Sequence, residues 1–224
     1  MERWDAQGNV YLVGEPFGAT PERVRELVGD ADGILEVSTT GEVTVWNPDG
    51  SVAEMSGNGT RIAAAWLARR TGAEEVVVRA GGRAVRVRAL GGDRYEQAIG
   101  RVRVGEPGEA AGVRFVPVDV GNPHAVVEGD PDELPRIGPL LETHRRFPGR
   151  TNVQVARVEG SGRVRARVWE RGAGETASSG SSAVAVAAAL VGDGETTVSF
   201  PGGDLVVRIE GGEATLTGTA VRSP

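Results

Sequence analysis

The chain has 224 residues, of which 39% are hydrophobic and 25% charged, and its net charge is −6. This composition is ordinary for a soluble globular protein, and the absence of a long basic run argues against a nucleic-acid partner. No apolar stretch reaches the ~18–20 residues of a membrane span, and the first residues lack a signal-peptide pattern, so we expect a cytoplasmic protein with no membrane contact.

Two missing residue types restrict the chemistry. The chain contains no Cys, which excludes disulfides, thiolate metal sites and thiol catalysis. It also contains no Lys, so it cannot hold pyridoxal phosphate as a Schiff base in the usual way. His124 and His144 are its only histidines, which argues against a His-rich metal site. We therefore expect no metal site and no conventional pyridoxal-phosphate cofactor.

The first half of the chain predicts short strands and one clear helix. Val, Ile, Leu and Tyr are typical of the strands, and an Ala-rich run that ends in Arg69, Arg70 and Gly72 is typical of a helix and its C-terminus. The predicted strands are 9–13, 34–37, 42–46, 76–88 and 94–104, and the predicted helix is 60–70.

The second half begins after segment 105–112, whose Gly and Pro content indicates a linker. Its predicted strands are 114–120, 125–128, 153–158, 164–169, 196–200, 205–209 and 214–217, and its predicted helices are 133–141 and 181–191.

The two halves resemble each other. A Gly-Asn pair opens a strand at Gly8 and again at Gly121, and a Ser-Gly turn precedes an Ala-rich helix at Ser56 and again at Ser179. The offsets are 113 and 123 residues, which indicates an internal duplication. We expect an α/β (α+β) protein with two pseudo-symmetric lobes, each a mixed or antiparallel sheet or barrel wrapped around a central helix, and an active site in the cleft between them. The expected lobes are 1–108, joined by the C-terminal strand 212–224, and 109–211.

Each Ser-Gly turn lies where a helix begins. The first N–H groups of a helix have no internal partner and favour an anion, and glycine lets a ligand come close to the backbone. The structural alternative is that Ser56 and Ser179 are ordinary N-caps. Two matched turns in duplicated halves favour a ligand site.

Further candidates flank turns and strand ends. His124 can act as a general base or as a packed histidine. Arg171, in the segment 170–172, can bind a carboxylate or form a surface ion pair. Asparagines also lie at such positions, where turn formation explains most of them; they are Asn9, Asn47, Asn122 and Asn152.

Several motifs together resemble the diaminopimelate epimerase family. Segment 47–61 is similar to the first active-site signature of the family, 119–126 to its central motif, 150–154 to the next motif and 170–180 to its second signature. Segment 7–9 is similar to the N-terminal motif, although the family usually has Asp where Val10 stands. The motifs occur in the family's order over nearly the whole chain.

The resemblance implies a cofactor-independent mechanism, in which two cysteines on opposite sides of the substrate α-carbon exchange its proton. It implies a homodimer and places the distal end of the substrate at Arg171 and the asparagines. The reacting carboxylate is expected at the two helix N-termini, near Gly57, Asn58, Gly180 and Ser181. The substrate-binding positions implied by the resemblance are Asn9, Asn47, Gly57, Asn58, Asn122, Asn152, Glu170, Arg171, Gly180 and Ser181.

The cysteine positions of the family are Ser56 and Ser179 in this chain. Because serine is a far weaker acid than cysteine, each hydroxyl needs an adjacent base. The resemblance places His124 near Ser56 and Glu170 near Ser179, which gives Ser56, Ser179, His124 and Glu170 as catalytic candidates.

Three hypotheses follow. The first is an epimerase of LL- and meso-diaminopimelate or of a related amino acid. The second is a catalytically disabled protein that binds an amino acid, which includes a Cys-to-Ser variant. The third is a dehydratase or isomerase of the same superfamily with His124 or Glu170 as its base.

Overall fold

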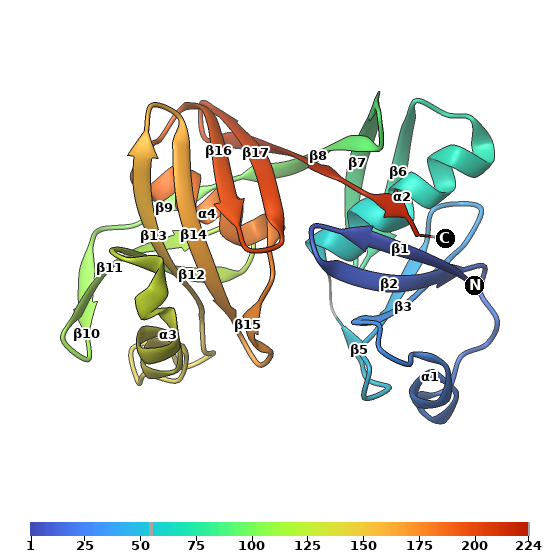
Figure 1. The fold of residues 1–224 in the computed structure, drawn as a ribbon, viewed down its shortest axis with the longest axis horizontal. Helices are drawn as coiled ribbons and strands as arrows, with labels where there is room; N and C mark the ends of the chain where they lie inside the picture. Colours follow the sequence, from blue (N-terminus) through green and yellow to red (C-terminus); the bar gives the residue numbers. More distant parts are fainter. Residues whose placement is uncertain (54–55, 224) are drawn as a thin grey trace. The chain divides into compact units, whose positions relative to one another are not determined.

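The computed structural model describes residues 1–53 and 56–223 (Figure 1). It has a mixed α/β fold whose described part divides into two compact units. Unit 1 is Met1–Ala98 together with the C-terminal segment from Thr217, and unit 2 is Ile99–Leu216. The expected linker 105–112 lies inside unit 2, where Gly108–Ala110 forms strand β10.

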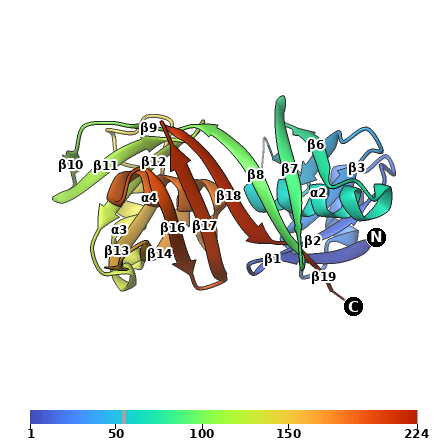
Figure 2. The same cartoon turned by 90° about the horizontal axis from the view of Figure 1, so that it is seen from above.

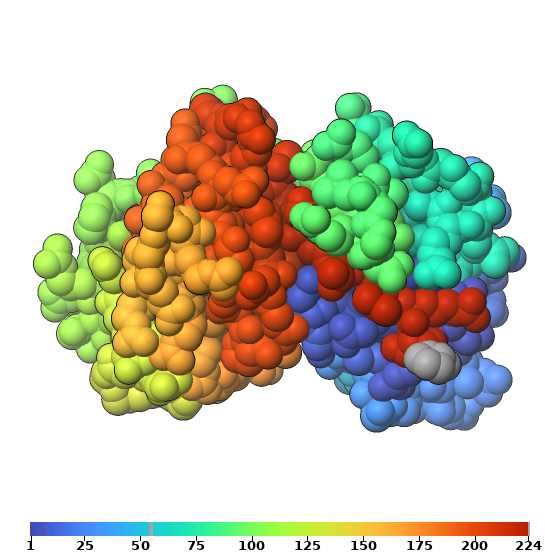
Figure 3. Space-filling model, turned by 45° about the horizontal axis from the view of Figure 1, so that its top comes forward, coloured from blue at the N-terminus to red at the C-terminus, as the bar shows by residue number. Residues whose placement is uncertain are grey.

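Unit 1 has a sheet with the strand order β19-β1-β2-β3-β4-β5 and a meander of β6, β7 and β8. Figure 3 shows the C-terminal residues in red against the blue N-terminal strands, in agreement with the antiparallel pairing of β19 and β1. The elements are α1 (Pro21–Leu27), α2 (Gly57–Thr71), β1 (Glu2–Ala6), β2 (Asn9–Gly14), β3 (Gly33–Val37), β4 (Val43–Trp46), β5 (Val52–Ala53), β6 (Glu75–Ala80), β7 (Arg83–Gly91), β8 (Arg94–Arg101) and β19 (Val221–Arg222).

Helix α2 is the centre of unit 1 (Figure 2). It packs against β1 and β2 of the sheet and against β6 and β7 of the meander. Its residues from Asn58 to Ala68 are all buried, which is typical of a helix enclosed on every side. The small side chains of Ala63, Ala64 and Ala65 let the strands approach closely. The helix ends at Gly72, which adopts the left-handed conformation (φ 70°) that glycine accommodates without strain.

Unit 2 has a sheet with the strand order β10-β11-β12-β13-β14-β16-β17-β18, with β9 paired to β11 and β15 paired to β14. The strands are β9 (Arg103–Val104), β10 (Gly108–Ala110), β11 (Val113–Asp119), β12 (Pro123–Glu128), β13 (Asn152–Gly160), β14 (Arg163–Glu170), β15 (Gly174–Thr176), β16 (Gly194–Phe200), β17 (Gly203–Glu210) and β18 (Glu213–Thr219). The helices are η1 (Pro131–Glu133), α3 (Leu134–Glu142) and α4 (Gly180–Leu190).

Helix α4 occupies in unit 2 the place that α2 has in unit 1. Residues 182–187 are buried, and those from Ala183 to Ala187 pack in one core with Val126, Val168 and Leu216 from the surrounding strands. The helix packs against strands from β11 to β17.

The predicted helices are confirmed with shifted ends. The helix expected at 60–70 begins at Gly57, the one at 133–141 begins after the short 3-10 turn η1, and the one at 181–191 begins at Gly180. The expected strand 76–88 is wrong as a single element, because left-handed Gly81 and Gly82 turn the chain between β6 and β7. Within the described residues, no helix combines the length and apolar content that crossing a membrane requires.

Strand β3 carries a glycine that the packing of β2 requires. Gly33 lies opposite Tyr11 in the parallel pairing of β2 and β3. A Cβ atom at Gly33 would lie 2.3 Å from the carbonyl oxygen of Trp46 and 2.8 Å from Cε1 of the Tyr11 ring. The missing side chain therefore provides the space in which the Tyr11 ring lies.

We expect Gly33→Ala to lower the free energy of unfolding by about 1–3 kcal/mol or more, because the clash with the Trp46 carbonyl cannot be relieved by a side-chain rotation. Gly149→Ala is the matched control, since nothing lies within 4 Å of a Cβ atom there. Urea unfolding of both variants measures the difference. Equal stability of the two variants would contradict the close packing at Gly33.

Candidate active site

The predicted site residues fall into one group in each unit. Unit 1 holds Asn9, Asn47, Ser56, Gly57 and Asn58. Unit 2 holds the other group, which is Asn122, His124, Asn152, Glu170, Arg171, Ser179, Gly180 and Ser181. The expected approach of His124 to Ser56 joins residues of different units and stays a prediction.

Ser56 is the N-cap of α2. Its Oγ accepts a hydrogen bond from the N–H of Gly59 at 3.0 Å, and the hydroxyl of Tyr11 lies 3.1 Å from the same oxygen. The Cβ atom of an alanine at position 59 would lie 3.1 Å from Oγ. The structural reading of Ser56 as an N-cap is therefore correct, and the tyrosine is a second polar partner.

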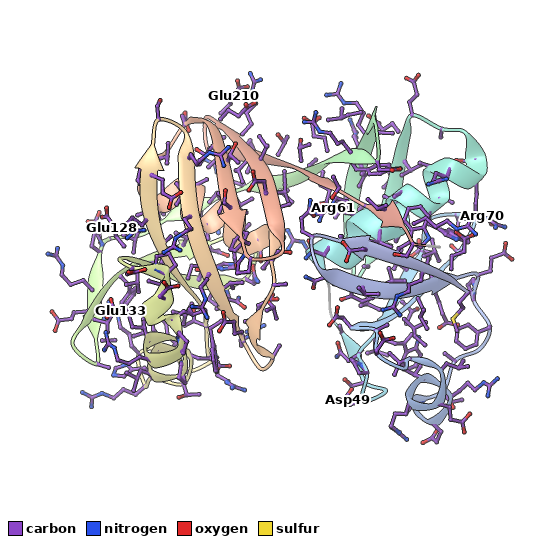
Figure 4. All side chains as sticks on the ribbon, in the orientation of Figure 1. Asp49, Arg61, Arg70, Glu128, Glu133 and Glu210 are labelled. Carbon is purple, nitrogen blue, oxygen red and sulfur yellow. The ribbon has the colours of Figure 1, made fainter. Side chains whose placement is uncertain are left out.

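Arg61 is fully buried behind this helix end (Figure 4). Among the described residues its hydrogen-bond partners are neutral groups: the carbonyl of Thr219 at 2.9 Å and the side-chain oxygens of Asn58, Gln7 and Gln97. Burial lowers the pKa of Arg61 to about 10, and the charge of Asp5 partly offsets this effect. The guanidinium is thus charged at neutral pH, and its bond to Asn58 places this charge at the first turn of α2.

Ser179 is the N-cap of α4, but its side chain makes no capping hydrogen bond. The Ser179 hydroxyl lies near the carboxylate of Glu170, which accepts a hydrogen bond from Thr176 Oγ1 at 2.7 Å. Burial raises the pKa of Glu170 above its usual range, although both hydroxyl contacts act in the opposite direction. The structure therefore brings together Ser179 and Glu170, as the sequence analysis expected.

His124 is 1% exposed, and both of its ring nitrogens have partners within unit 2. Nε2 lies 3.0 Å from Asn122 Oδ1, and Nδ1 lies 3.0 Å from Gln154 Nε2. The second N–H of that amide bonds to Ser182 Oγ at 2.9 Å. Because an amide nitrogen can only donate, Nδ1 accepts and Nε2 carries the proton.

The tautomer and the burial of His124 oppose its use as a base. Burial lowers the pKa of His124 to about 3, so the ring is neutral at neutral pH. It donates from Nε2 to the oxygen of Asn122 and fixes the orientation of that amide. Within the described residues the Oε1 atom of Gln154 has no partner, but an unpaired buried acceptor costs less than an unpaired donor would.

The turn that carries Arg171 is held by two side chains. Asn152 accepts a hydrogen bond from the N–H of Arg171 and donates to the carbonyl of Pro123, both at 3.0 Å. Glu142 accepts from the N–H of Gly172 at 2.7 Å, from the Trp169 indole at 2.8 Å and from Arg150 at 2.6 Å. The guanidinium of Arg171 itself is exposed and bonds to the carbonyl of Gly149 at 3.2 Å.

The remaining candidates have local partners. Asn47 bonds through its side chain to Ser51 Oγ at 2.9 Å and is part of a turn, as its sequence context indicated. Gly57 accepts from Gln97 through its carbonyl. Asn9 opens β2, and Gly180 and Ser181 form the first turn of α4, where a Cβ atom on Gly180 would lie 2.7 Å from Leu216.

A pocket of about 540 Å³ opens beside Asn122 and His124 in unit 2. Residues of β9 and β11 line it together with the turn 121–123 and the ring of Phe147. Across the described part of the chain, no group of three or more His, Asp or Glu side chains is arranged to hold a metal ion.

Sequence reasoning did not single out several residues that the structure places around the candidates: Tyr11, Arg61, Glu142, Gln154 and Thr176. Alternation along a strand carries a signal for two of them. Tyr11 lies two residues after Asn9 on β2, and Gln154 lies two residues after Asn152 on β13, so each pair shares a face. Glu142 gives no such signal, because its partners come from distant segments.

Comparisons with known proteins agree with the motifs. The model of the diaminopimelate epimerase family matches residues 116–223. A diaminopimelate epimerase from Xanthomonas axonopodis pv. citri is 40% identical, and one from Xylella fastidiosa strain M12 is 41% identical. Each of these matches covers 79% of this chain and 72% of the relative.

Solved structures share the fold at low identity. The structure of a predicted epimerase from Pseudomonas aeruginosa has a TM-score of 0.74 at 16% identity, and the match covers 100% of this chain and 96% of that one. A hydroxyproline epimerase from Agrobacterium vitis has a TM-score of 0.68 at 15% identity, with 100% and 90% covered. The order of the motifs, the Ser-Gly starts of α2 and α4 and the 40% identity to the Xanthomonas enzyme together lead to one conclusion: this chain belongs to the diaminopimelate epimerase family.

Proposed function

We propose that this chain is a cofactor-independent epimerase that interconverts LL- and meso-diaminopimelate, or a related amino acid, by proton transfer at the α-carbon. The observation that carries the proposal is that Ser179 lies near Glu170. An N-cap serine normally accepts a hydrogen bond from its own helix, but Ser179 makes no such bond, and its hydroxyl lies near Glu170. This proximity supports proton transfer between Ser179 and Glu170.

The Ser179 side of the reaction follows from this contact. The α-proton of the substrate moves to Ser179 Oγ while the hydroxyl proton moves to the Glu170 carboxylate, so no free serine alkoxide forms. The electron pair left on the α-carbon delocalises into the substrate carboxylate. The first N–H groups of α4, at Gly180 and Ser181, are suited to stabilise that charge. Ser56 at the start of α2 supplies the second proton-transfer group.

His124 has a positioning role in this proposal. The neutral ring donates to the oxygen of Asn122, which leaves the amide nitrogen of Asn122 as the group that faces a ligand. An amide nitrogen donates, and the substrate offers carboxylates as acceptors. The expected general-base role of His124 is replaced by this one, because burial keeps its pKa at about 3 and Gln154 occupies Nδ1.

Glu142 holds the turn that carries Glu170 and Arg171. Burial alone would raise the pKa of Glu142, but the hydrogen bonds from Gly172, Trp169 and Arg150 outweigh it and lower the pKa below its usual range. The carboxylate therefore stabilises the fold above the unfolded-state pKa of about 4.3. That contribution is lost as the pH falls through the lower folded-state pKa.

A second candidate function is amino-acid binding without turnover. The observation that favours it is the absence of any thiol from the chain, because cysteine ionises near pH ~8.5 and serine does not ionise near neutral pH. We also propose that the protein is cytoplasmic and that it forms a homodimer. Light scattering on the purified protein tests the dimer.

The direct test is exchange of the substrate α-proton with deuterium in heavy water, followed by NMR on LL- and meso-diaminopimelate and on other diamino acids. We expect the purified chain to catalyse exchange. Binding by calorimetry without exchange, together with exchange by a Ser56→Cys, Ser179→Cys double variant, would identify a disabled homologue instead.

Glu170→Gln should slow α-proton exchange by about 10²- to 10⁴-fold, since the amide cannot accept the Ser179 proton. The matched control is Glu175→Gln, which alters an exposed carboxylate that pairs with Arg167; its exchange rate should stay within about threefold of wild type, far below the effect of removing a general base. Equal rates for the two variants would contradict the role of Glu170.

Glu142→Gln should lower the free energy of unfolding at pH 7 by about 2 kcal/mol, because it removes a charge that accepts several hydrogen bonds. The difference from wild type should shrink below about pH 4, as Glu142 becomes protonated in the wild-type protein. Urea unfolding across roughly pH 3–7 measures it. A difference that stays constant with pH would show that the Glu142 charge is not responsible.

A further inference from the structure

We propose that Tyr11 is the proton-transfer partner of Ser56, so that a tyrosine–serine relay works on the unit 1 side of the reaction. This inference rests on the proposed epimerase function and assigns a residue to it that neither the motifs nor the comparisons indicate. Tyr11 is 7% exposed, and its hydroxyl lies 3.1 Å from Ser56 Oγ.

The position of Tyr11 is built into the sheet. Its ring lies against the bare Cα of Gly33, where any side chain would collide with the ring and with the Trp46 carbonyl. On the other side, Gly59 lets the first turn of α2 approach Ser56 closely. Two glycines thus make room for a contact between a phenol and a serine hydroxyl.

The donor and acceptor positions of the Ser56 hydroxyl explain how the relay can work in both directions. A serine hydroxyl has one proton to donate and two acceptor positions, and the N–H of Gly59 uses one of the acceptor positions. When Tyr11 donates to Ser56, both acceptor positions are filled and the serine proton points elsewhere, as a proton donor needs. When Ser56 donates to Tyr11, one acceptor position is open for a substrate proton.

The transfer balances in both directions. In the donating direction, the phenol proton of Tyr11 moves to Ser56 Oγ as the original Oγ proton moves to the α-carbanion, and Tyr11 becomes a phenolate. In the accepting direction, the α-proton moves to Oγ as the Oγ proton returns to the phenolate. Ser56 is neutral before and after each step, so the charge resides on the far more acidic phenol, whose ordinary pKa is about 10.

The surroundings favour a transient negative charge. The hydroxyls lie at the N-terminus of α2, where the helix dipole is positive. The buried guanidinium of Arg61 donates a hydrogen bond at 2.9 Å to Asn58 in the first turn of the same helix, and its hydrogen-bond partners among the described residues are neutral. This positive charge, which the Asp5 charge offsets only in part, adds to the positive end of the helix dipole and favours a phenolate there.

The test is a double-mutant cycle on α-proton exchange with LL- and meso-diaminopimelate. Tyr11→Phe should slow exchange by about 100-fold or more in the wild-type background. In a Ser56→Cys background Tyr11→Phe should change the exchange rate by less than about threefold, since a thiol ionises on its own near pH ~8.5. Tyr95→Phe is the matched control, because Tyr95 is the other tyrosine of the chain and is similarly buried in unit 1.

The outcomes separate the relay from the proposed function. Exchange by wild type with an unchanged rate for Tyr11→Phe overturns the relay alone. An equal loss in the wild-type and Ser56→Cys backgrounds also overturns it, because a residue that only supports the fold does not distinguish a hydroxyl from a thiol. A wild-type chain that exchanges no α-proton on any amino acid overturns the proposed function, and the relay with it.

Discussion

Enclosure of a small-residue helix by strands is the constraint on which the rest of this structure depends. Alanines such as Ala64 and Ala185 leave α2 and α4 with little side-chain volume, so each unit packs its sheet closely around one of them. A helix enclosed in this way has an N-terminus with little access to water. Its unpaired N–H groups must find protein or ligand partners, and this makes both helix ends suitable for binding an anion.

The two helix ends meet this requirement differently. Ser56 caps α2 in the ordinary way and adds Tyr11 as a partner, whereas Ser179 makes no capping hydrogen bond and lies near Glu170. In the proposed mechanism the two sides therefore use chemically distinct proton-transfer groups, a phenol and a carboxylic acid. Their ordinary pKa values differ by several units, so one side is predisposed to donate a proton and the other to accept one.

Burial decides the role of each ionisable group more than its type does. Desolvation removes His124 from acid–base chemistry and raises the pKa of Glu170, although both occur in motifs that suggest a base. Burial also lowers the pKa of Arg61, but only to about 10, so the guanidinium remains charged at neutral pH. Glu142 is the opposite case, since three donors overcome its burial and keep it ionised.

The sequence by itself determined the elements and the candidates that depend on local pattern. The Ala-rich runs predicted α2 and α4, the Ser-Gly turns predicted where they begin, and the motif order indicated the family, because each of these signals lies within a few consecutive residues. Alternation along β2 also indicated the face of the sheet on which Tyr11 lies, but it did not identify Ser56 as the partner of Tyr11.

Only the tertiary structure decided which groups meet. The contact of Tyr11 with Ser56 depends on the space left by Gly33, and the tautomer of His124 depends on Gln154, a residue on a neighbouring strand. These contacts join segments far apart in the chain, and the energies that fix them are desolvation and hydrogen-bond geometry. Both depend on what surrounds a group in the folded protein, which no local pattern specifies.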